Sequence, residues 1–197
     1  MKIWNLESDF NQLSKTALII LNQPIPSKLL RDVWHKVSIR VCADGGANRL
    51  MRLDLIPDMI VGDLDSLEEN TRSFYSGVKI IHVDDQDTND FEKCIKLIHN
   101  MPLDQILAVG ALGGRFDHQM ANINALYKYS RMNIYLMSNE SIVFLLDAGK
   151  HRIFSCVNEI FKTNCGLLPM KGDAVVRTNG FKWDIGKFLE MMAQTFR

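Results

Sequence analysis

Cysteines are few in this sequence and none belongs to a recognisable site. The four, Cys42, Cys94, Cys156 and Cys165, form neither a CxxC pair nor the spacing of a zinc site. A chain of 197 residues buries roughly two-thirds of its unfolded surface, so its stability requires no disulfide. We therefore expect the cysteines to be buried free thiols.

Long apolar runs are also lacking. The longest, Ala17–Leu21 and Ile142–Leu146, are the size of strands and far too short to span a bilayer. The charged residues Lys2, Glu7 and Asp9 stand near the N-terminus, where a signal peptide would need an apolar stretch. We expect a cytoplasmic protein that does not bind membranes.

The chain has no excess of charge of either sign. Its 23 basic residues equal its 23 acidic ones, which argues against a general nucleic-acid binder. The balance hides an asymmetry, because the stretch from Asp54 to Glu92 has eleven acidic residues and two basic ones, Arg72 and Lys79. Such a stretch is either a solvated acidic face or a site for a divalent cation, which takes oxygen ligands.

The signatures of a phosphate-binding loop are missing as well. The sequence contains neither a Walker A motif nor GxGxxG, and it has no internal repeat or low-complexity segment. Any nucleotide that binds must therefore be held by something other than a P-loop.

What the sequence does contain is a series of short apolar runs, each followed by polar or glycine-rich residues. Runs of this length favour strands that are buried on both faces of a parallel sheet. The predicted strands are Ala17–Leu21, Ser38–Ala43, Met59–Val61, Lys79–Val83, Gln105–Val109 and Asn133–Met137.

Two helical patterns lie between these runs. The first follows Asn89 or Asp90, either of which can cap it, and its apolar residues are Phe91, Cys94, Ile95 and Ile98. The second is opened by Asp117, and its apolar residues are Phe116, Met120, Ile123 and Tyr127. Alternation of strands and helices predicts an α/β fold with right-handed crossovers.

The pattern changes near residue 138, where we place a boundary between residues 1–138 and a smaller β-rich region, 139–197. The segments Ser141–Leu146 and His151–Ser155, joined by a turn, predict an antiparallel hairpin. Two further segments are strand-like, Gly166–Met170 and Asp173–Arg177.

Four acidic or glycine-rich clusters follow the predicted strands. Because ligands bind an open α/β sheet at the carboxyl ends of its strands, we expect these clusters to form one site. The clusters are Ala43–Arg49, Gly62–Ser66, Asp84–Asp90 and Gly110–Asp117.

Asp63 and Asp65 are two residues apart, so in extended backbone their carboxylates project to the same side. Two carboxylates so near to each other repel unless a proton or a cation lies between them. Mg²⁺ held by carboxylates, water and phosphates is such a cation. The alternative is that both are turn or cap residues ahead of Leu67–Asn70.

The glycine pairs also allow two interpretations. Asp44-Gly45-Gly46 lets the backbone approach a ligand closely, but Asp-Gly and Gly-Gly are ordinary turn pairs too. Gly113-Gly114-Arg115 can offer amides and a guanidinium to phosphate at the start of a helix. A plain strand-to-helix turn has the same sequence.

Taken in order, the clusters resemble eukaryotic-type thiamine pyrophosphokinases. Five short motifs that keep their order across most of the chain argue against coincidence. The resemblance rests on Ala43–Asn48, Gly62–Ser66, Asp85–Phe91 and Gly113–Asp117, with a weaker match at Cys165–Pro169 followed by Gly180–Asp184.

The resemblance implies a Rossmann-like, parallel-sheet catalytic domain over residues 1–138, which would bind ATP and Mg²⁺. It implies a smaller β-sandwich domain over residues 139–197, which would bind thiamine, and a homodimer with thiamine between the subunits. The implied reaction transfers pyrophosphate from ATP to the hydroxyl of thiamine, giving thiamine diphosphate and AMP.

The resemblance also implies roles for particular residues. The implied Mg²⁺ ligands are Asp63, Asp65 and Asp90. The implied catalytic set adds Asp44 and Asp117, and the implied substrate-binding set is Asn48, Gln86, Thr88, Arg115 and Trp183. Gln86 and Trp183 would contact thiamine from the partner subunit, although without the family Trp183 would be taken for a packing residue. The sequence leaves open whether Asp90 or Asp117 accepts the hydroxyl proton.

One segment departs from the family pattern. Where the family continues in strands, this chain has a helical apolar stripe and ends at Arg197. The stripe consists of Ile185, Phe188, Leu189, Met192 and Phe196. We therefore expect a helix over Ile185–Phe196 and an incomplete β-sandwich.

Two other functions fit parts of the sequence. Asp63-Leu64-Asp65-Ser66 resembles the nucleophile motif of haloacid-dehalogenase-type phosphohydrolases, but that motif usually ends the first strand of its domain. A shortened C-terminus also fits a catalytically impaired isoform that binds thiamine or a nucleotide.

Overall fold

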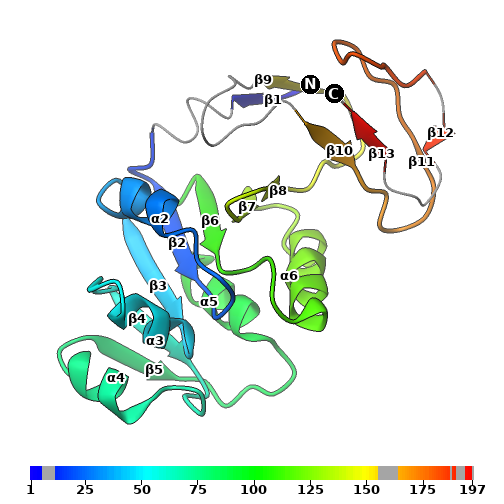
Figure 1. Ribbon diagram of the computed structural model, residues 1–197. Helices are drawn as coiled ribbons and strands as arrows, with labels where there is room; N and C mark the ends of the chain where they lie inside the picture. The colour runs from blue at the N-terminus through cyan, green and yellow to red at the C-terminus, as the bar shows by residue number, and fades with distance from the viewer. Residues whose placement is uncertain (6–11, 155–163, 187, 190–193, 197) are drawn as a thin grey trace. The chain divides into compact units, whose positions relative to one another are not determined.

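The computed structural model describes residues 1–5, 12–154, 164–186, 188–189 and 194–196 (Figure 1). The contacts between residues divide the chain into two units, Met1–Phe154 and Ser155–Arg197. The boundary predicted near residue 138, between an α/β domain and a smaller β-rich region, stays a prediction.

A seven-stranded sheet forms the centre of the first unit, in the order β5-β4-β3-β2-β6-β7-β8 (Figure 1). Its neighbours are parallel except for β8, which is antiparallel to β7. The strands are β2 (Thr16–Ile20), β3 (Ile39–Ala43), β4 (Met59–Gly62), β5 (Lys79–His82), β6 (Gln105–Val109), β7 (Ile134–Met137) and β8 (Ile142–Val143). The six predicted strands and the mixed α/β fold are confirmed.

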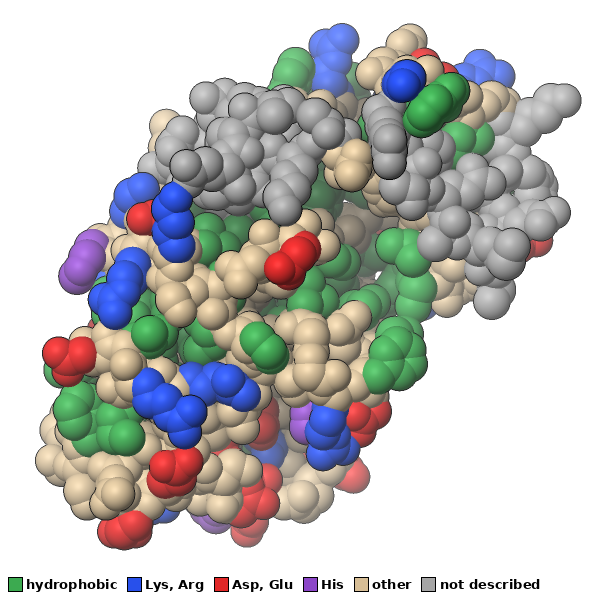
Figure 2. Space-filling view, viewed as in Figure 1, with side chains coloured by type: hydrophobic (Ala, Val, Ile, Leu, Met, Phe, Trp, Pro, Cys, Tyr) green, Lys and Arg blue, Asp and Glu red, His purple; other side chains and the backbone are tan. Residues whose placement is uncertain are grey.

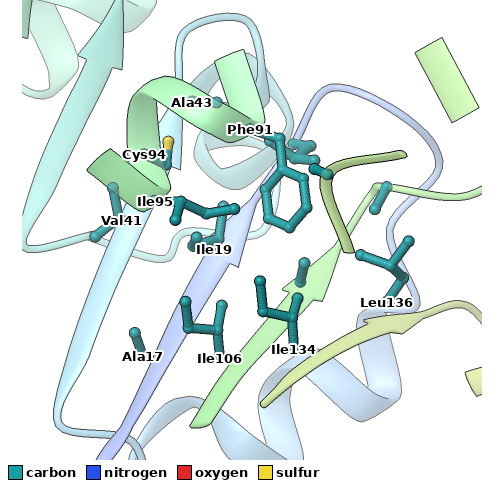
Figure 3. Close-up of a cluster of buried hydrophobic side chains, with 14 of the residues drawn as sticks. Ala17, Ile19, Val41, Ala43, Phe91, Cys94, Ile95, Ile106, Ile134 and Leu136 are labelled. Atoms are coloured by element: carbon teal, nitrogen blue, oxygen red, sulfur yellow. The ribbon is translucent and has the colours of Figure 1, made fainter. Parts of the chain in front are cut away.

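Burial on both faces explains why the central strands are apolar at successive positions. In β2, Ala17 and Ile19 belong to one core cluster, and the alternating Leu18 is buried equally well. Helix α5 (Asp90–Ile98) covers the face of the sheet that carries Ala17 and Ile19. Figure 3 shows Phe91 and Ile95 of this helix packed over the sheet.

The helices of the first unit are α2 (Ser27–Trp34), α3 (Gly46–Met51), α4 (Glu69–Phe74), α5 and α6 (Phe116–Lys128). Both predicted helices are present, and the side chain of Asn89 caps α5 by accepting the N–H of Glu92 at 2.8 Å. The face predicted for α6 is wrong at its start, because Phe116 is 73% exposed. The residues of α6 that are buried are Asn122, Ala125 and Leu126.

The hairpin predicted after residue 140 is not formed. Strand β8 pairs with β7, whereas β9 (His151–Phe154) pairs in parallel with β1 (Lys2–Asn5), a strand that the sequence did not predict. The last residue of the predicted hairpin, Ser155, lies outside the described residues.

Trp4 provides the physical reason for this pairing. Its side chain is 3% exposed, its ring centroid lies 4.8 Å from that of Phe144, and its Nε1 donates to His151 Nδ1 at 3.0 Å. Burying one large aromatic side chain holds β1 against β9, so a contact distant in sequence replaces the local hairpin.

The second unit contains two short antiparallel pairs. Strand β10 (Cys165–Leu167) pairs with β13 (Gln194–Phe196), and β11 (Ala174–Val175) pairs with β12 (Phe188–Leu189). The helix predicted over Ile185–Phe196 is therefore wrong. Pairing with β10 and β11 gives this backbone ladder hydrogen bonds, which outweigh the helical spacing of its apolar residues. Met192 of that stripe lies outside the described residues.

The cysteines that the structure describes are free thiols. Cys42 and Cys94 are buried as predicted, and burial raises the pKa of both thiols. Cys165 is only partly buried, and Cys156 lies outside the described residues.

Acidic and basic side chains are interspersed on the face of the molecule that Figure 2 shows, in agreement with the net charge of zero. Within the described part of the chain, none of the helices has both the length and the apolar character that a membrane span needs.

Candidate active site

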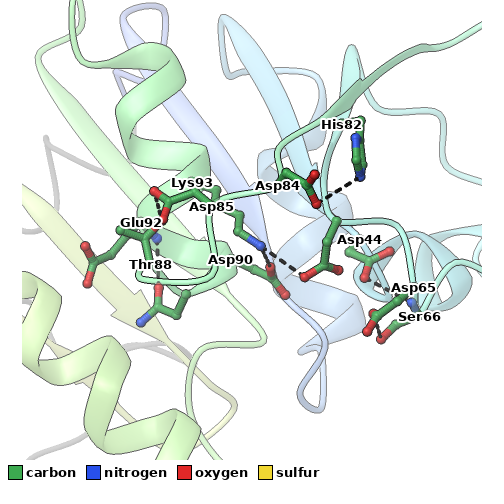
Figure 4. Close-up of polar contacts among 12 residues, drawn as sticks. Asp44, Asp65, Ser66, His82, Asp84, Asp85, Thr88, Asp90, Glu92 and Lys93 are labelled. Carbon is green, nitrogen blue, oxygen red and sulfur yellow. Dashed lines mark hydrogen bonds and ion pairs between the residues drawn. The ribbon is translucent and has the colours of Figure 1, made fainter.

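The predicted acidic residues follow three neighbouring strands of the central sheet. Asp44 follows β3, Asp63 and Asp65 follow β4, and Asp90 opens α5 after β5. Because β3, β4 and β5 are parallel neighbours, their carboxyl ends meet at one edge of the sheet. The fold thus brings carboxylates that are distant in sequence to one place, and Figure 4 shows Asp44, Asp65 and Asp90 there.

Asp44 is the most enclosed of the four, with 1% of its surface exposed. Its Oδ2 accepts the backbone N–H of Ser66 at 3.2 Å, whereas its buried Oδ1 has no hydrogen-bond partner among the described residues. Gly62 makes room for this side chain, since a Cβ at Gly62 would lie 2.7 Å from the Cβ of Asp44. The glycine at the end of β4 therefore allows the Asp44 side chain to be buried with one oxygen unpartnered.

Asp44, Asp63 and Asp65 each offer a carboxylate oxygen, and the three oxygens lie within 4.8 Å of one another. They do not converge through extended backbone as predicted, because Leu64 between the two aspartates has a φ of 67°. The left-handed residue turns the chain so that the carboxylates still meet. Neither aspartate caps α4, whose N-cap is Glu68.

Burial, together with the charges of Asp90, Asp63 and Asp65, raises the pKa of Asp44 to about 6, against the opposing hydrogen bond from the N–H of Ser66. The free protein thus holds a buried carboxylate in an unfavourable field. Three convergent carboxylate oxygens, on a cluster whose Asp44 also has an unpartnered buried oxygen, form a donor set that fits Mg²⁺.

Lys93 is the site residue that the sequence analysis missed. Its Nζ lies 3.2 Å from Asp63 Oδ2 and 3.3 Å from Asp90 Oδ1 (Figure 4). Burial tends to lower the pKa of Lys93, but its bonds to the two carboxylates prevail and raise it. The available signal was a lysine inside an apolar helical stripe, three residues after Asp90 and so on the same face.

Asn48 and Thr88, both predicted to bind substrate, hold loops of the site. Asn48 Nδ2 donates to the carbonyl of Ser66 at 2.8 Å, and its Oδ1 accepts the N–H of Glu68 at 3.2 Å. Thr88 Oγ1 donates to Asp85 Oδ2 at 2.8 Å. Gln86 follows Asp85 in the sequence, and its side chain is exposed.

Arg115 and Asp117 pair with each other at the start of α6, where both are exposed. Arg115 donates to Asp117 through Nε at 3.1 Å and through Nη2 at 2.5 Å. This bidentate hydrogen bond lowers the pKa of Asp117 to about 2. The preceding turn requires Gly110, which has a φ of 68° and whose Cβ would lie 2.3 Å from the carbonyl oxygen of Leu21.

Trp183 belongs to the second unit and is 56% exposed. It stands on a loop closed by Asp184, whose carboxylate accepts the N–H groups of Gly180 and Phe181 and the hydroxyl of Thr178, each at 3.1 Å. These hydrogen bonds close the loop that carries the exposed indole ring of Trp183.

Comparison with known proteins gives a consistent result. The family model of the thiamin pyrophosphokinase catalytic domain matches residues 30–138. Thiamine pyrophosphokinase 1 of Oryza sativa is 37% identical over 194 residues, covering 86% of this chain and 73% of the rice protein. The chain belongs to the thiamine pyrophosphokinase family.

A solved structure of the family agrees with this assignment. The crystal structure of yeast thiamin pyrophosphokinase matches with a TM-score of 0.80 at 26% identity, covering 99% of this chain and 87% of that one. Thiamine pyrophosphokinase 2 of Arabidopsis thaliana is 36% identical over 197 residues, covering 87% of this chain and 73% of its own. The phosphohydrolase alternative also loses its basis, since Asp63 follows the third strand of the central sheet along the chain.

In the absence of divalent cations, we expect Asp44→Asn to stabilise the protein at pH 8 by on the order of 1–3 kcal/mol. The folded-state pKa of Asp44 is raised from 3.8 to about 6, so its ionised form destabilises the fold fully above pH 6 and not at all below its unfolded value. The gain should therefore shrink as the pH falls from 6 towards 4.

Urea unfolding with a chelator at pH 8 and pH 4.5 measures this gain. Added Mg²⁺ should stabilise the wild type more than Asp44→Asn. A destabilised variant at pH 8, or a gain that grows on acidification, would contradict this account of the cluster.

Proposed function

We infer that the chain is a thiamine pyrophosphokinase, which transfers the pyrophosphoryl group of ATP to the hydroxyl of thiamine and releases AMP. The observation that carries this is the meeting of Asp44, Asp63 and Asp65, with one buried oxygen left unpartnered, at the carboxyl edge of a parallel sheet. Family membership supplies the substrates, and the site supplies the charge that a metal–nucleotide complex needs.

For the metal, we keep Asp63, Asp65 and Asp90 as the proposed Mg²⁺ ligands, with Asp44 as the fourth carboxylate of the cluster. Support comes from the shared edge and from the short distances among the carboxylates of Asp44, Asp63 and Asp65. When bound, Mg²⁺ would offset the negative charge of the transferred phosphates.

The remaining chemistry needs positioning rather than covalent catalysis. The thiamine oxygen forms a bond to the β-phosphorus, the bond from that phosphorus to the oxygen of AMP breaks, and the hydroxyl proton passes to a carboxylate. Of the two expected acceptors, Asp117 is held by Arg115 and its pKa is about 2, which makes it a weak base. Of the two, we therefore propose Asp90 as the acceptor, although it is also paired with Lys93 and proposed as a Mg²⁺ ligand.

For thiamine, we propose that residues 139–197 form the β-sandwich part of the binding site and that Trp183 stacks on the cationic ring. Stacking of a cation on an indole contributes roughly 0.5–2 kcal/mol. The exposure of Trp183 and the closed loop that Asp184 maintains support this role. In the proposed homodimer, Trp183 and Gln86 would reach the aspartates of the partner subunit.

The impaired isoform is the weaker alternative. It was derived from a shortened C-terminus, where a helix was also expected, and the structure has strands β12 and β13 in that segment. None of the observations on the described residues favours it.

Coupled enzymatic detection of AMP tests the proposed function. Purified protein with ATP, Mg²⁺ and thiamine should release AMP, and omission of thiamine should stop the release. AMP formation that does not depend on thiamine would indicate a different acceptor, and its absence with well-folded protein would reject the function.

A further inference from the structure

Lys93 is a buried cation inside the acidic cluster, and it has no role in the proposed reaction so far. Its side chain is 3% exposed, and it extends from the middle of α5 between the buried Phe91 and Cys94. Its ammonium bridges Asp63 on the loop after β4 and Asp90 at the start of α5. In the free protein, one buried ammonium group thus forms salt bridges with both carboxylates.

The bridge shares Asp63 with the group of oxygens that could hold a metal. Asp63 contacts Lys93 through Oδ2 and also belongs to the set with Asp44 and Asp65. Any divalent cation held by that set would therefore lie close to a permanent positive charge. Because Lys93 is almost fully buried, solvent screens this interaction less than it would at the surface.

We propose that Lys93 is a positioning residue that tunes the cluster for the metal–nucleotide complex and against the bare divalent cation. This rests on the proposed function, since it assumes that Mg²⁺ reaches the site together with ATP. Lys93 reduces the attraction of four carboxylates for a free cation, and it offsets their repulsion of the triphosphate.

The sign of each effect follows from Coulomb's law. Removing one positive charge makes the cluster more negative, which strengthens binding of Mn²⁺ or Mg²⁺ alone. The same change weakens binding of Mg·ATP, whose net charge is negative. A residue that only supported the local fold would weaken both when replaced, so the opposite directions separate the two roles.

The test compares Lys93→Met, which keeps the length of the side chain without its charge, with Lys93→Arg, which keeps the charge. Two dissociation constants are measured: that of Mn²⁺ alone, by electron paramagnetic resonance, and that of Mg²⁺ with α,β-methylene-ATP, by calorimetry. We expect Lys93→Met to bind Mn²⁺ about tenfold more tightly and the nucleotide complex about tenfold more weakly. Lys93→Arg should stay within about threefold of the wild type for both.

A change of both constants in the same direction, or no change in the Mn²⁺ constant, would overturn the proposal. Circular dichroism checks that Lys93→Met folds, and Lys93→Gln replaces it if it does not, because glutamine retains a hydrogen-bond donor. Wild-type protein that releases no AMP would refute the proposed function. The Mn²⁺ comparison would still decide the effect of Lys93 on bare metal.

Discussion

Asp65→Asn is expected to lower kcat by about a hundredfold to a thousandfold while leaving the fold intact. The substitution removes one of the converging carboxylates and with it part of the charge that holds a metal at the phosphates. The hydroxyl of Ser66 donates to Asp65 Oδ1 at 2.9 Å, and an asparagine oxygen can accept the same bond. Loss of a negative charge also relieves repulsion within the cluster, so the thermal midpoint should stay equal or rise.

Asp54→Asn is the matched control for this loss of activity. Asp54 lies in the same acidic stretch, but it is exposed and stands outside the cluster. Its φ of 56° is a conformation that asparagine tolerates well. Steady-state rates and thermal melts of both variants should show loss of activity in Asp65→Asn alone. Wild-type turnover in Asp65→Asn would remove this carboxylate from the mechanism.

Mixing Trp183→Ala chains with Asp65→Asn chains is expected to restore activity that neither variant has at low thiamine concentration. If each site takes its aspartates from one subunit and its tryptophan from the other, a mixed dimer has one intact site. About half of the dimers are mixed after random exchange, so the recovered rate should approach a quarter of the wild-type rate. Trp183→Ala alone should raise the KM for thiamine far more than the KM for ATP, because only thiamine stacks on the ring.

Asp63→Asn mixed with Asp65→Asn is the control for subunit exchange. Both changes damage the same side of every site, so no intact site can form in a mixed dimer. Native mass spectrometry confirms that heterodimers are present. If confirmed heterodimers of the first pair show only the average activity of their parents, the shared site is refuted for this protein.

The central sheet could be predicted because each of its inner strands is covered on both faces. Val41 and Ile106, for instance, lie in mainly apolar runs that end in turn residues, and both are fully buried in the core. The same logic located the acidic clusters, because the carboxyl ends of parallel strands share an edge. The site could therefore be located from the sequence before its geometry was known.

Other features depend on contacts that local sequence patterns do not encode. Strand β1 forms because Trp4 is buried against residues about 140 positions away, as its bond to His151 shows. Strands β12 and β13 carry apolar residues at helical spacing, but their backbones pair with β11 and β10. Lys93 lies inside an apolar stripe three residues after Asp90, but only the folded chain places Asp63, 30 residues away, beside it.

Phosphorus-31 NMR of one reaction mixture tests the central claim most directly, since it distinguishes all the phosphate products. Wild-type protein with thiamine, ATP and Mg²⁺ should form AMP and thiamine diphosphate in equal amounts, and the same mixture with Mg²⁺ chelated should form neither. Formation of ADP with thiamine monophosphate, or the expected products at an unchanged rate without a divalent cation, would contradict pyrophosphoryl transfer at this acidic edge.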